Sequence, residues 1–209
     1  MITAEEVLSK RTALIVIDVQ NEFCHPDGTM GKKGMNMTMI EGMMKPLCTL
    51  IDKAHEAKIP VVYIKNTEDE WTDNEAWCSR PDGNENSPNE CVTRRGTWGA
   101  ELYNLQPDMR DTVIEKHRFS AFYNTRLDTA LKAKNIETVV ITGVSSNVCV
   151  MTSATHAVML GYHVVVSEDA CGAWSAEDHN MAMANLRRFV GKVVSSDKIL
   201  SVWEKKKAN

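Results

Sequence analysis

Short apolar runs alternate along the chain with longer segments whose apolar residues recur at helical spacing. The run over residues 12–19 is almost continuously apolar, which is typical of a strand buried on both faces. Between residues 37 and 58 apolar side chains recur every three or four positions, which predicts a helix that Pro46 kinks or divides. The same patterns predict strands at 12–19, 60–65, 112–116, 137–143, 162–167 and 192–195, and helices at 37–58, 125–134, 147–160 and 176–189.

The regular alternation of strands and helices favours one fold class. It predicts an α/β fold with a doubly wound parallel sheet of about six strands and helices on both faces. No Pro-, Gly- or Ser-rich linker divides the 209 residues, so we expect a single domain over residues 1–209. Residues 66–99 are rich in Asn, Asp, Glu, Gly and Pro and are expected to form a long loop. A loop of this length is usually functional or mobile, which makes it a candidate active-site loop.

Composition and charge narrow the partners that we expect. The 24 basic and 28 acidic side chains give a net charge of −4, which argues against a nucleic-acid-binding surface. No apolar run approaches the ~18 residues needed to span a bilayer, and the first residues do not resemble a signal peptide. The Met-rich and Trp-bearing segments suggest a homo-oligomer, with dimer and tetramer equally compatible. Scattered cysteines predict free thiols in a reducing cytoplasm, at positions 24, 48, 78, 91, 149 and 171.

The candidate chemistry centres on three residues that follow apolar strands. Cys149 lies where a strand passes through a Gly/Ser/Asn turn into a helix, so unpaired N–H groups and the helix dipole are expected to favour its thiolate. Asp18 and Lys116 each close an apolar run. Because parallel strands present their carboxyl ends at one edge, a nucleophile, a base and an orienting ammonium are expected there. Each residue alone also has a structural explanation, as a turn carboxylate, a solvated lysine or a small buried thiol.

Four segments of the chain resemble motifs of the isochorismatase-like cysteine hydrolases. They are ALIVIDVQNEF at 13–23, KHRFSAFYNT at 116–125, GVSSNVCV at 143–150 and the acidic turn DACG at 169–172. The resemblance implies a six-stranded, usually oligomeric fold in which Asp18, Lys116 and Cys149 form a catalytic triad. It also implies a cis peptide between Val144 and Ser145, and an oxyanion hole made by the N–H groups of Ser145 and Cys149.

The resemblance also narrows the reaction. Family members that cleave a vinyl ether generally lack the nucleophilic cysteine, so Cys149 favours amide chemistry. Nicotinamidases usually carry an Asp-x-His…His metal site, whereas this chain has no histidine between His55 and His117, so we expect no metal and no cofactor. The favoured function is hydrolysis of a small amide or ureide through an acyl thioester, as in biuret, triuret, ureidoacrylate and N-carbamoylsarcosine hydrolases. The alternatives are an isochorismate vinyl-ether hydrolase, a nicotinamidase-like amidase and a scaffold protein that retains the fold.

Substrate contacts are expected from five further residues. Asn66 ends the second predicted strand, where its amide can read a carbonyl or an N–H group. Phe23 and Phe119 are expected to form an apolar wall, with packing in the core as the alternative. Trp71 is expected to close the site from the loop, and Tyr123 to add a hydroxyl. Weaker candidates are Trp98, Arg94 and Arg95.

Overall fold

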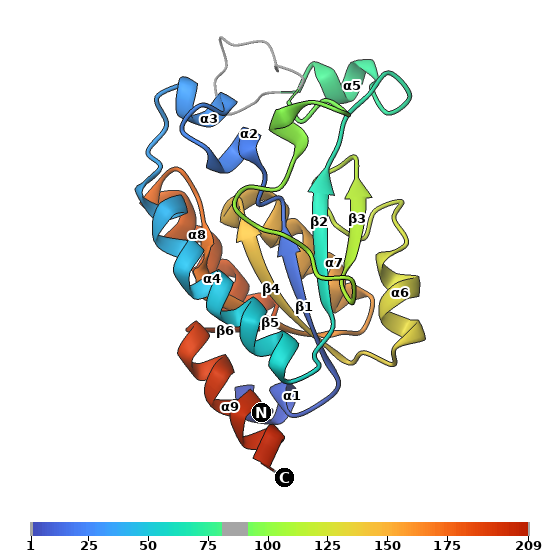
Figure 1. Ribbon diagram of the computed structural model, residues 1–209, viewed down its shortest axis with the longest axis vertical. Coiled ribbons are helices and arrows are strands. Elements are labelled where there is room, and N and C mark those ends of the chain that lie inside the picture. The colour runs from blue at the N-terminus through green and yellow to red at the C-terminus, as the bar shows by residue number, and fades with distance from the viewer. Residues whose placement is uncertain (1, 81–91, 209) are drawn as a thin grey trace.

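Six parallel strands form one sheet in the order β3-β2-β1-β4-β5-β6 (Figure 1). This computed structural model describes residues 2–80 and 92–208, with side chains as far as Lys205. The strands are β1 (Thr12–Ile17), β2 (Val61–Asn66), β3 (Thr112–Lys116), β4 (Thr138–Val144), β5 (His163–Gly172) and β6 (Lys192–Val194). The chain moves outward from β1 to β3 and then returns to place β4 beside β1. The pair β1 and β4 is therefore the point at which the strand order reverses, where sheets of this class bind ligands.

Helices cover both faces of the sheet, as predicted for a doubly wound α/β fold (Figure 1). One face carries α1 (Ala4–Leu8), α4 (Thr38–Glu56) and α9 (Ser196–Ala208). The other carries α6 (Leu127–Ala133), α7 (Met151–Met159) and α8 (Ala176–Phe189). Five short elements complete the described chain, namely α2 (Asn21–Cys24), α3 (Thr29–Lys32), α5 (Glu75–Cys78), the 3-10 turn η1 (Trp98–Ala100) and the π-helical turn η2 (Ser146–Val150).

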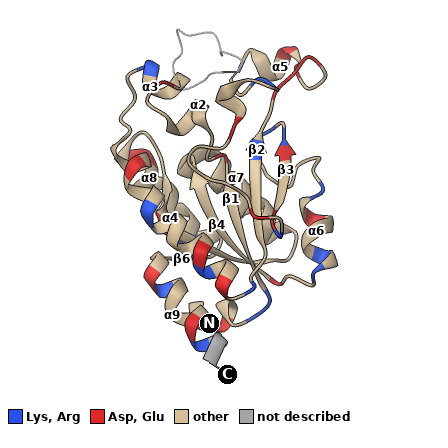
Figure 2. Ribbon diagram, in the orientation of Figure 1, with Lys and Arg blue, Asp and Glu red and all other residues tan. Residues whose placement is uncertain are grey.

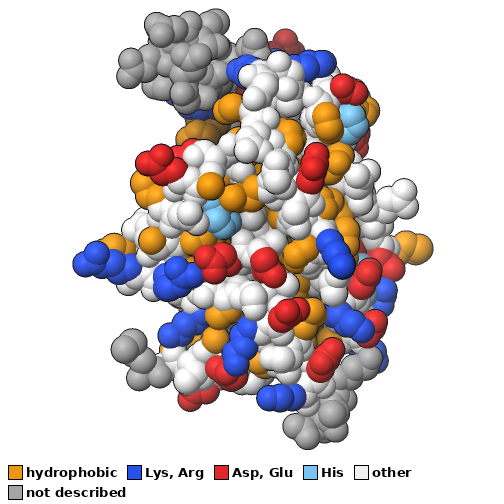
Figure 3. Space-filling model, turned by 90° about the vertical axis from the view of Figure 1, so that its left-hand side faces the viewer, with side chains coloured by type: hydrophobic (Ala, Val, Ile, Leu, Met, Phe, Trp, Pro, Cys, Tyr) orange, Lys and Arg blue, Asp and Glu red, His pale blue; other side chains and the backbone are white. Residues whose placement is uncertain are grey.

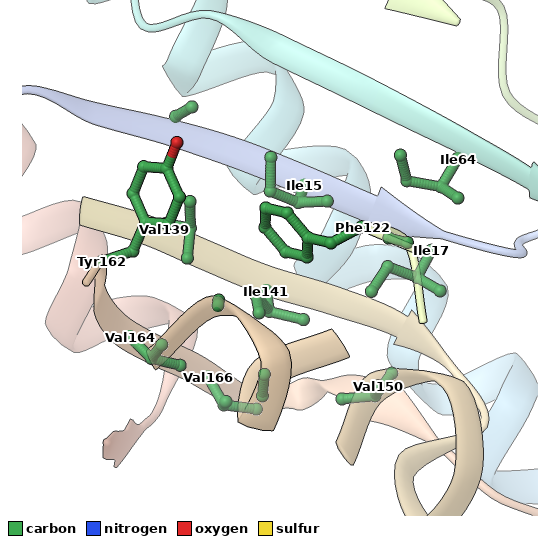
Figure 4. Close-up of a cluster of buried hydrophobic side chains, with 14 of the residues drawn as sticks. Ile15, Ile17, Ile64, Phe122, Val139, Ile141, Val150, Tyr162, Val164 and Val166 are labelled. Carbon is green, nitrogen blue, oxygen red and sulfur yellow. The ribbon is translucent and has the colours of Figure 1, made fainter. Parts of the chain in front are cut away.

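The alternation of side chains along each strand builds two separate cores. On β1, Ile15 and Ile17 point into one cluster while Leu14 and Val16 point into the other. Figure 4 shows the first cluster, in which β1, β4 and β5 pack with Phe122 and with residues of the helical layer. The second cluster packs β1 and β2 against α4 and α9. Strands buried on both faces need apolar residues at every position, which explains their near-continuous apolar runs.

The predicted strands and helices are observed, together with helices that were not predicted, of which α9 is the longest. Three of the predicted elements differ in their course. Helix α4 runs without a break through Pro46, because its face of Met43, Leu47 and Leu50 is fully buried against the sheet. Strand β5 extends well beyond the predicted 162–167, through a register shift opposite β4. The predicted helix at 147–160 begins as a π-helical turn, η2 (Ser146–Val150), before α7 starts.

Charge is concentrated on the helices and loops (Figure 2). On the face drawn in Figure 3, basic side chains are interspersed with acidic ones and with small apolar patches. Within residues 2–80 and 92–208 no helix is long and apolar enough to cross a membrane. Part of the predicted loop at 66–99, including Cys91, lies outside the described residues.

Candidate active site

Three strand ends bring a carboxylate, an ammonium and a thiol together at the carboxyl edge of the sheet. The Nζ atom of Lys116 lies 2.8 Å from Oδ2 of Asp18 and 3.4 Å from Sγ of Cys149. Asp18 directly follows β1, Lys116 ends β3, and Cys149 lies in η2 just after β4. The three residues singled out from the sequence are therefore in contact, beside the point where the strand order reverses.

The backbone around Asp18 directs its carboxylate into this edge. Asp18 has a φ of 52°, in the left-handed region that Asp and Asn adopt more readily than most residues. Its N–H donates to the carbonyl oxygen of Ile64 at 2.9 Å, which ties the turn to β2.

Neighbouring Gly143 on β4 has a φ of 107°, and a Cβ there would lie 2.1 Å from the carbonyl oxygen of Ile17. Only glycine therefore permits β4 to approach β1 this closely.

Lys116 is fully buried and its ammonium is surrounded by acceptors. Strands lie about 4.8 Å apart, so an extended lysine side chain on β3 can pass β2 and reach the end of β1. Besides Asp18 and Cys149, the ammonium contacts Oδ1 of Asn66 at 3.4 Å and donates to the carbonyl oxygen of Arg118 at 3.0 Å. Asn66 in turn donates from Nδ2 to Thr93 at 2.8 Å. Asn66 thus lies in the site, where it orients the lysine.

Cys149 lies in the π-helical turn η2, which opens the helical segment that continues as α7. The carbonyl oxygen of Ser145 accepts from the N–H groups of Val148 and Val150, both at 3.1 Å. The Ser146 hydroxyl is hydrogen-bonded to Nδ1 of His179 at 2.8 Å, and both residues are buried, so α8 supports the turn from behind. The peptide bond between Val144 and Ser145 is cis, at the predicted position.

Burial dominates the electrostatics of these three groups. It raises the pKa of the Cys149 thiol to about 12, although the Lys116 ammonium lowers it. Desolvation of the thiolate therefore opposes the lowering of the pKa that is expected from a helix terminus. Burial likewise raises the pKa of the Asp18 carboxyl, opposed by Lys116. Burial disfavours the Lys116 ammonium, but Asp18 and Cys149 outweigh it, and the pKa of Lys116 is raised.

A second group of polar and aromatic residues follows the strand ends that carry Asn66 and Lys116, and most of its members were not predicted from the sequence. Glu68 follows β2, is 2% exposed, and accepts from Nε1 of Trp77 at 3.0 Å. The Trp77 ring packs against Phe119 with ring centroids 4.9 Å apart. The Arg80 guanidinium lies 3.4 Å from the Trp77 ring centroid, and that of Arg118 lies 4.6 Å from it. Phe119, three residues beyond Lys116, therefore forms a wall of packed side chains with Trp77 and Arg80, which come from the long loop.

The other residues predicted to contact the substrate differ in their surroundings. Trp71 is 89% exposed and Tyr123 is half exposed. Phe23 packs against Trp174, with ring centroids 6.3 Å apart. Trp98 packs against His25, with ring centroids 5.0 Å apart. The weaker candidates are engaged in ion pairs, Arg94 with Asp73, and Arg95 with Asp69 and Glu115.

The predicted acidic turn at 169–172 lies within strand β5. Asp169 accepts from the N–H and hydroxyl groups of Ser196 at 2.7 and 2.6 Å, so it anchors the start of α9. Its role in the described structure is therefore structural. Among the residues that the structure describes, no cluster of three or more His, Cys, Asp or Glu side chains is arranged to hold a metal ion.

Comparisons with known proteins agree with this geometry. The isochorismatase domain model matches residues 12–198. The ureidoacrylate amidohydrolase RutB of Acinetobacter baylyi is 30% identical, over 96% of this chain and 87% of that protein. A cysteine hydrolase from Pseudomonas syringae pv. phaseolicola shares the fold, with a TM-score of 0.82 and 24% identity over 94% of this chain and 93% of that one. N-carbamoylsarcosine amidase from Thermoplasma acidophilum superposes with a TM-score of 0.71 and 28% identity, over 90% of this chain and 97% of that one. On the breadth of these matches, the chain belongs to the isochorismatase family.

Proposed function

We propose that this protein is a cysteine amidohydrolase that cleaves a C–N bond of a small amide or ureide through an acyl thioester on Cys149. The observation that carries the proposal is the position of the Lys116 ammonium, in contact with both the Asp18 carboxylate and the Cys149 sulfur. A nucleophile, a base and a group that orients both are the parts that acyl transfer requires. The names of the relatives, a ureidoacrylate amidohydrolase and an N-carbamoylsarcosine amidase, support a ureide or amide substrate.

The first half of the reaction forms the thioester. Asp18 takes the proton of the Cys149 thiol, and the resulting thiolate attacks the substrate carbonyl carbon to form a C–S bond. Asp18 then returns this proton to the leaving nitrogen as the C–N bond breaks, so ammonia or an amine departs. The proton moves between two groups inside the site, so net charge is conserved. The buried site therefore never has to accommodate an additional charge, which makes a raised thiol pKa compatible with a thiolate nucleophile.

The second half releases the acid. Asp18 removes a proton from a water molecule, and the hydroxide attacks the thioester carbonyl. The C–S bond then breaks, the acid or carbamate leaves, and the proton on Asp18 restores the Cys149 thiol. In both halves of the reaction, the Lys116 ammonium keeps the Asp18 carboxylate and the Cys149 sulfur close to each other. The N–H groups of Ser145 and Cys149 are the proposed donors to the oxyanion, a role that typically lowers the barrier by several kcal/mol.

Ammonia release from a panel of small amides tests this proposal. The panel contains biuret, triuret, ureidoacrylate, N-carbamoylsarcosine, maleamate and nicotinamide, each assayed with and without a chelator. We expect one ureide to be hydrolysed, with Cys149→Ala inactive and the chelator without effect. Full activity of Cys149→Ala would refute the thioester. Pyruvate release from isochorismate would favour the vinyl-ether reaction, and chelator-sensitive hydrolysis of nicotinamide would favour the nicotinamidase-like one.

The remaining expectations concern assembly and location. We propose a single-domain, cytoplasmic homo-oligomer that acts on a small molecule without a cofactor. Large apolar side chains exposed on neighbouring helices α7 and α8 support self-association, among them Met159, Met181 and Phe189, which are 71%, 61% and 68% exposed. Light scattering of the purified protein distinguishes dimer from tetramer, and a monomer would contradict the proposal.

A further inference from the structure

A half-buried guanidinium lies on the wall of the proposed active site and has no part in the reaction described above. Arg80 stacks on the Trp77 ring at 3.4 Å and lies 5.3 Å from the ring centroid of Phe119. Trp77 in turn donates a hydrogen bond to Glu68, which lies two residues beyond Asn66, a contact of the Lys116 ammonium. Arg80 is therefore tied through Trp77 and Phe119 to the segments that follow Asn66 and Lys116, and its pKa, which burial lowers, is also sensitive to Cys149.

The charges around this pocket do not balance among the described residues. Lys116, Arg80 and Arg118 bring three positive charges, whereas Asp18 and Glu68 bring two negative ones, and the Cys149 thiol is neutral. The Asp18 carboxylate forms an ion pair with Lys116 at 2.8 Å. Glu68 lies 4.0 Å from Arg80, as an ion pair without a hydrogen bond, and also accepts from Trp77. One positive charge is thus left for a bound ligand to neutralise.

Arg80 is better placed to neutralise a ligand than the other arginines of this region. Arg118 donates to the carbonyl oxygens of Thr72 and His117, which hold it to the protein. Arg94 and Arg95 form ion pairs at 2.7–2.8 Å. Arg80 donates to one carbonyl, that of Trp77, and its stacked plane leaves further N–H groups for a bidentate partner.

We infer that Arg80 is a specificity-determining residue that binds a carboxylate on the substrate, so that the protein acts on anionic amides or ureides in preference to neutral ones. This inference rests on the proposed function, because it places the reacting carbonyl at Cys149 and the carboxylate at Arg80. A planar guanidinium fixed by stacking matches a carboxylate through two parallel hydrogen bonds. Trp77 and Phe119 would then contact the apolar part of the substrate between these two ends.

Alkylation of Cys149 tests the inference without requiring turnover. Iodoacetate and iodoacetamide both transfer a CH2 group to the thiolate with loss of iodide, and they differ mainly in carrying a carboxylate or a neutral amide. The measurement is the ratio of their rate constants at Cys149, determined by peptide mass spectrometry. Because both reagents need the same thiolate, the ratio cancels changes in the reactivity of the sulfur itself.

We expect Arg80→Gln to lower the iodoacetate to iodoacetamide ratio by about tenfold, as expected for loss of a charge-assisted hydrogen bond. Arg80→Lys keeps the charge without the planar fork and should give an intermediate ratio. Arg95→Gln is the matched control, because it removes an equal charge from the same loop but from outside the pocket, and it should leave the ratio unchanged. An unchanged ratio in Arg80→Gln, or an equal fall in Arg95→Gln, would overturn the inference.

A substrate pair separates this inference from the proposed function. N-carbamoylglycine and its amide, N-carbamoylglycinamide, share a ureide and differ in the carboxylate. We expect Arg80→Gln to raise KM for the acid about tenfold while changing KM for the amide little. Hydrolysis of both compounds with no preference that depends on Arg80 would overturn the inference and leave the cysteine amidohydrolase intact. If neither compound is hydrolysed, the alkylation ratio still decides the role of Arg80.

Discussion

Replacing Asp18 by Asn tests the base and the buried ion pair in one substitution. At 2.8 Å and an effective dielectric constant of about 20, the attraction between Asp18 and Lys116 is about 6 kcal/mol, largely offset by the desolvation of both charges. The asparagine keeps the shape of the side chain but leaves the Lys116 ammonium buried without a counter-charge. Removing one member of a buried pair typically costs about 3–5 kcal/mol, so we expect the free energy of unfolding to fall by that amount. Loss of the general base should lower kcat by at least about a thousandfold.

The complementary substitution Lys116→Met makes this prediction sharper. Methionine is also long and unbranched, but it leaves Asp18 as an unpaired buried carboxylate, so this variant should be destabilised similarly. The double variant Asp18→Asn/Lys116→Met contains neither charge and should recover most of the lost stability, with a coupling energy of at least about 2 kcal/mol. All three variants should be inactive.

Urea unfolding at neutral pH and steady-state ammonia release supply the two readouts. If Asp18→Asn retains turnover within tenfold of the wild type, Asp18 is not the base. If the two single losses of stability simply add in the double variant, the pair is not energetically coupled, and the reasoning from the 2.8 Å contact fails.

Two further predictions concern the pH dependence of stability and the packing beneath the site. Burial raises the pKa of Cys149 to about 12, so above about pH 8.5 the unfolded chain releases a proton that the folded protein retains. The free energy of unfolding should therefore fall as the pH rises, by up to ~1.4 kcal/mol per pH unit from this group. Urea unfolding of Cys149→Ala should show a shallower fall, and equal slopes in the variant and the wild type would contradict the prediction. Gly143→Ala should cost at least about 3 kcal/mol and inactivate the enzyme, because its Cβ would lie 2.1 Å from a carbonyl oxygen of β1. Gly161→Ala is the control, because Gly161 also has a positive φ, of 92°, but nothing lies within 4 Å of the added Cβ. Thermal unfolding should therefore report a loss of only about 1 kcal/mol for this variant. Similar losses in both variants would exclude steric contact as the cause.

The three candidate catalytic residues could be located from the sequence because the topology of the sheet leaves such residues few positions. Asp18, Lys116 and Cys149 each follow a run of apolar residues that is recognisable in isolation. Once the runs are recognised as parallel strands, their carboxyl ends must share an edge. The electrostatic state of Cys149 could not be predicted in this way, because its raised pKa depends on how completely the surrounding layers remove water.

The wall of the site could not be predicted, because its contacts come from a segment without periodicity. Trp71 and Trp77 lie in the same polar loop, and composition does not distinguish them. In the structure Trp71 is exposed, whereas Trp77 donates a hydrogen bond to Glu68 and packs against Phe119. The sequence does contain one relevant pattern, the start of the short helix α5, where the side chain of the N-cap residue Asn74 accepts a hydrogen bond from the backbone N–H of Trp77. Asn followed by Glu is a helix-start pattern, but four residues are too few to recognise from sequence.

This division between sheet and loop has a consequence for specificity. The triad is held by strands, by Asn66 and by the glycine contact between β4 and β1, none of which depends on the side chain of Trp77 or Arg80. The loop is held instead by its own pairs, including Glu68 with Trp77 and Arg94 with Asp73. Substitutions in the wall should therefore change which amide is bound, with little loss of the stability that holds the nucleophile in place. The chemistry at Cys149 and the choice of substrate are physically separable in this fold, and a change at Arg80 should show the separation as a change in KM with kcat retained.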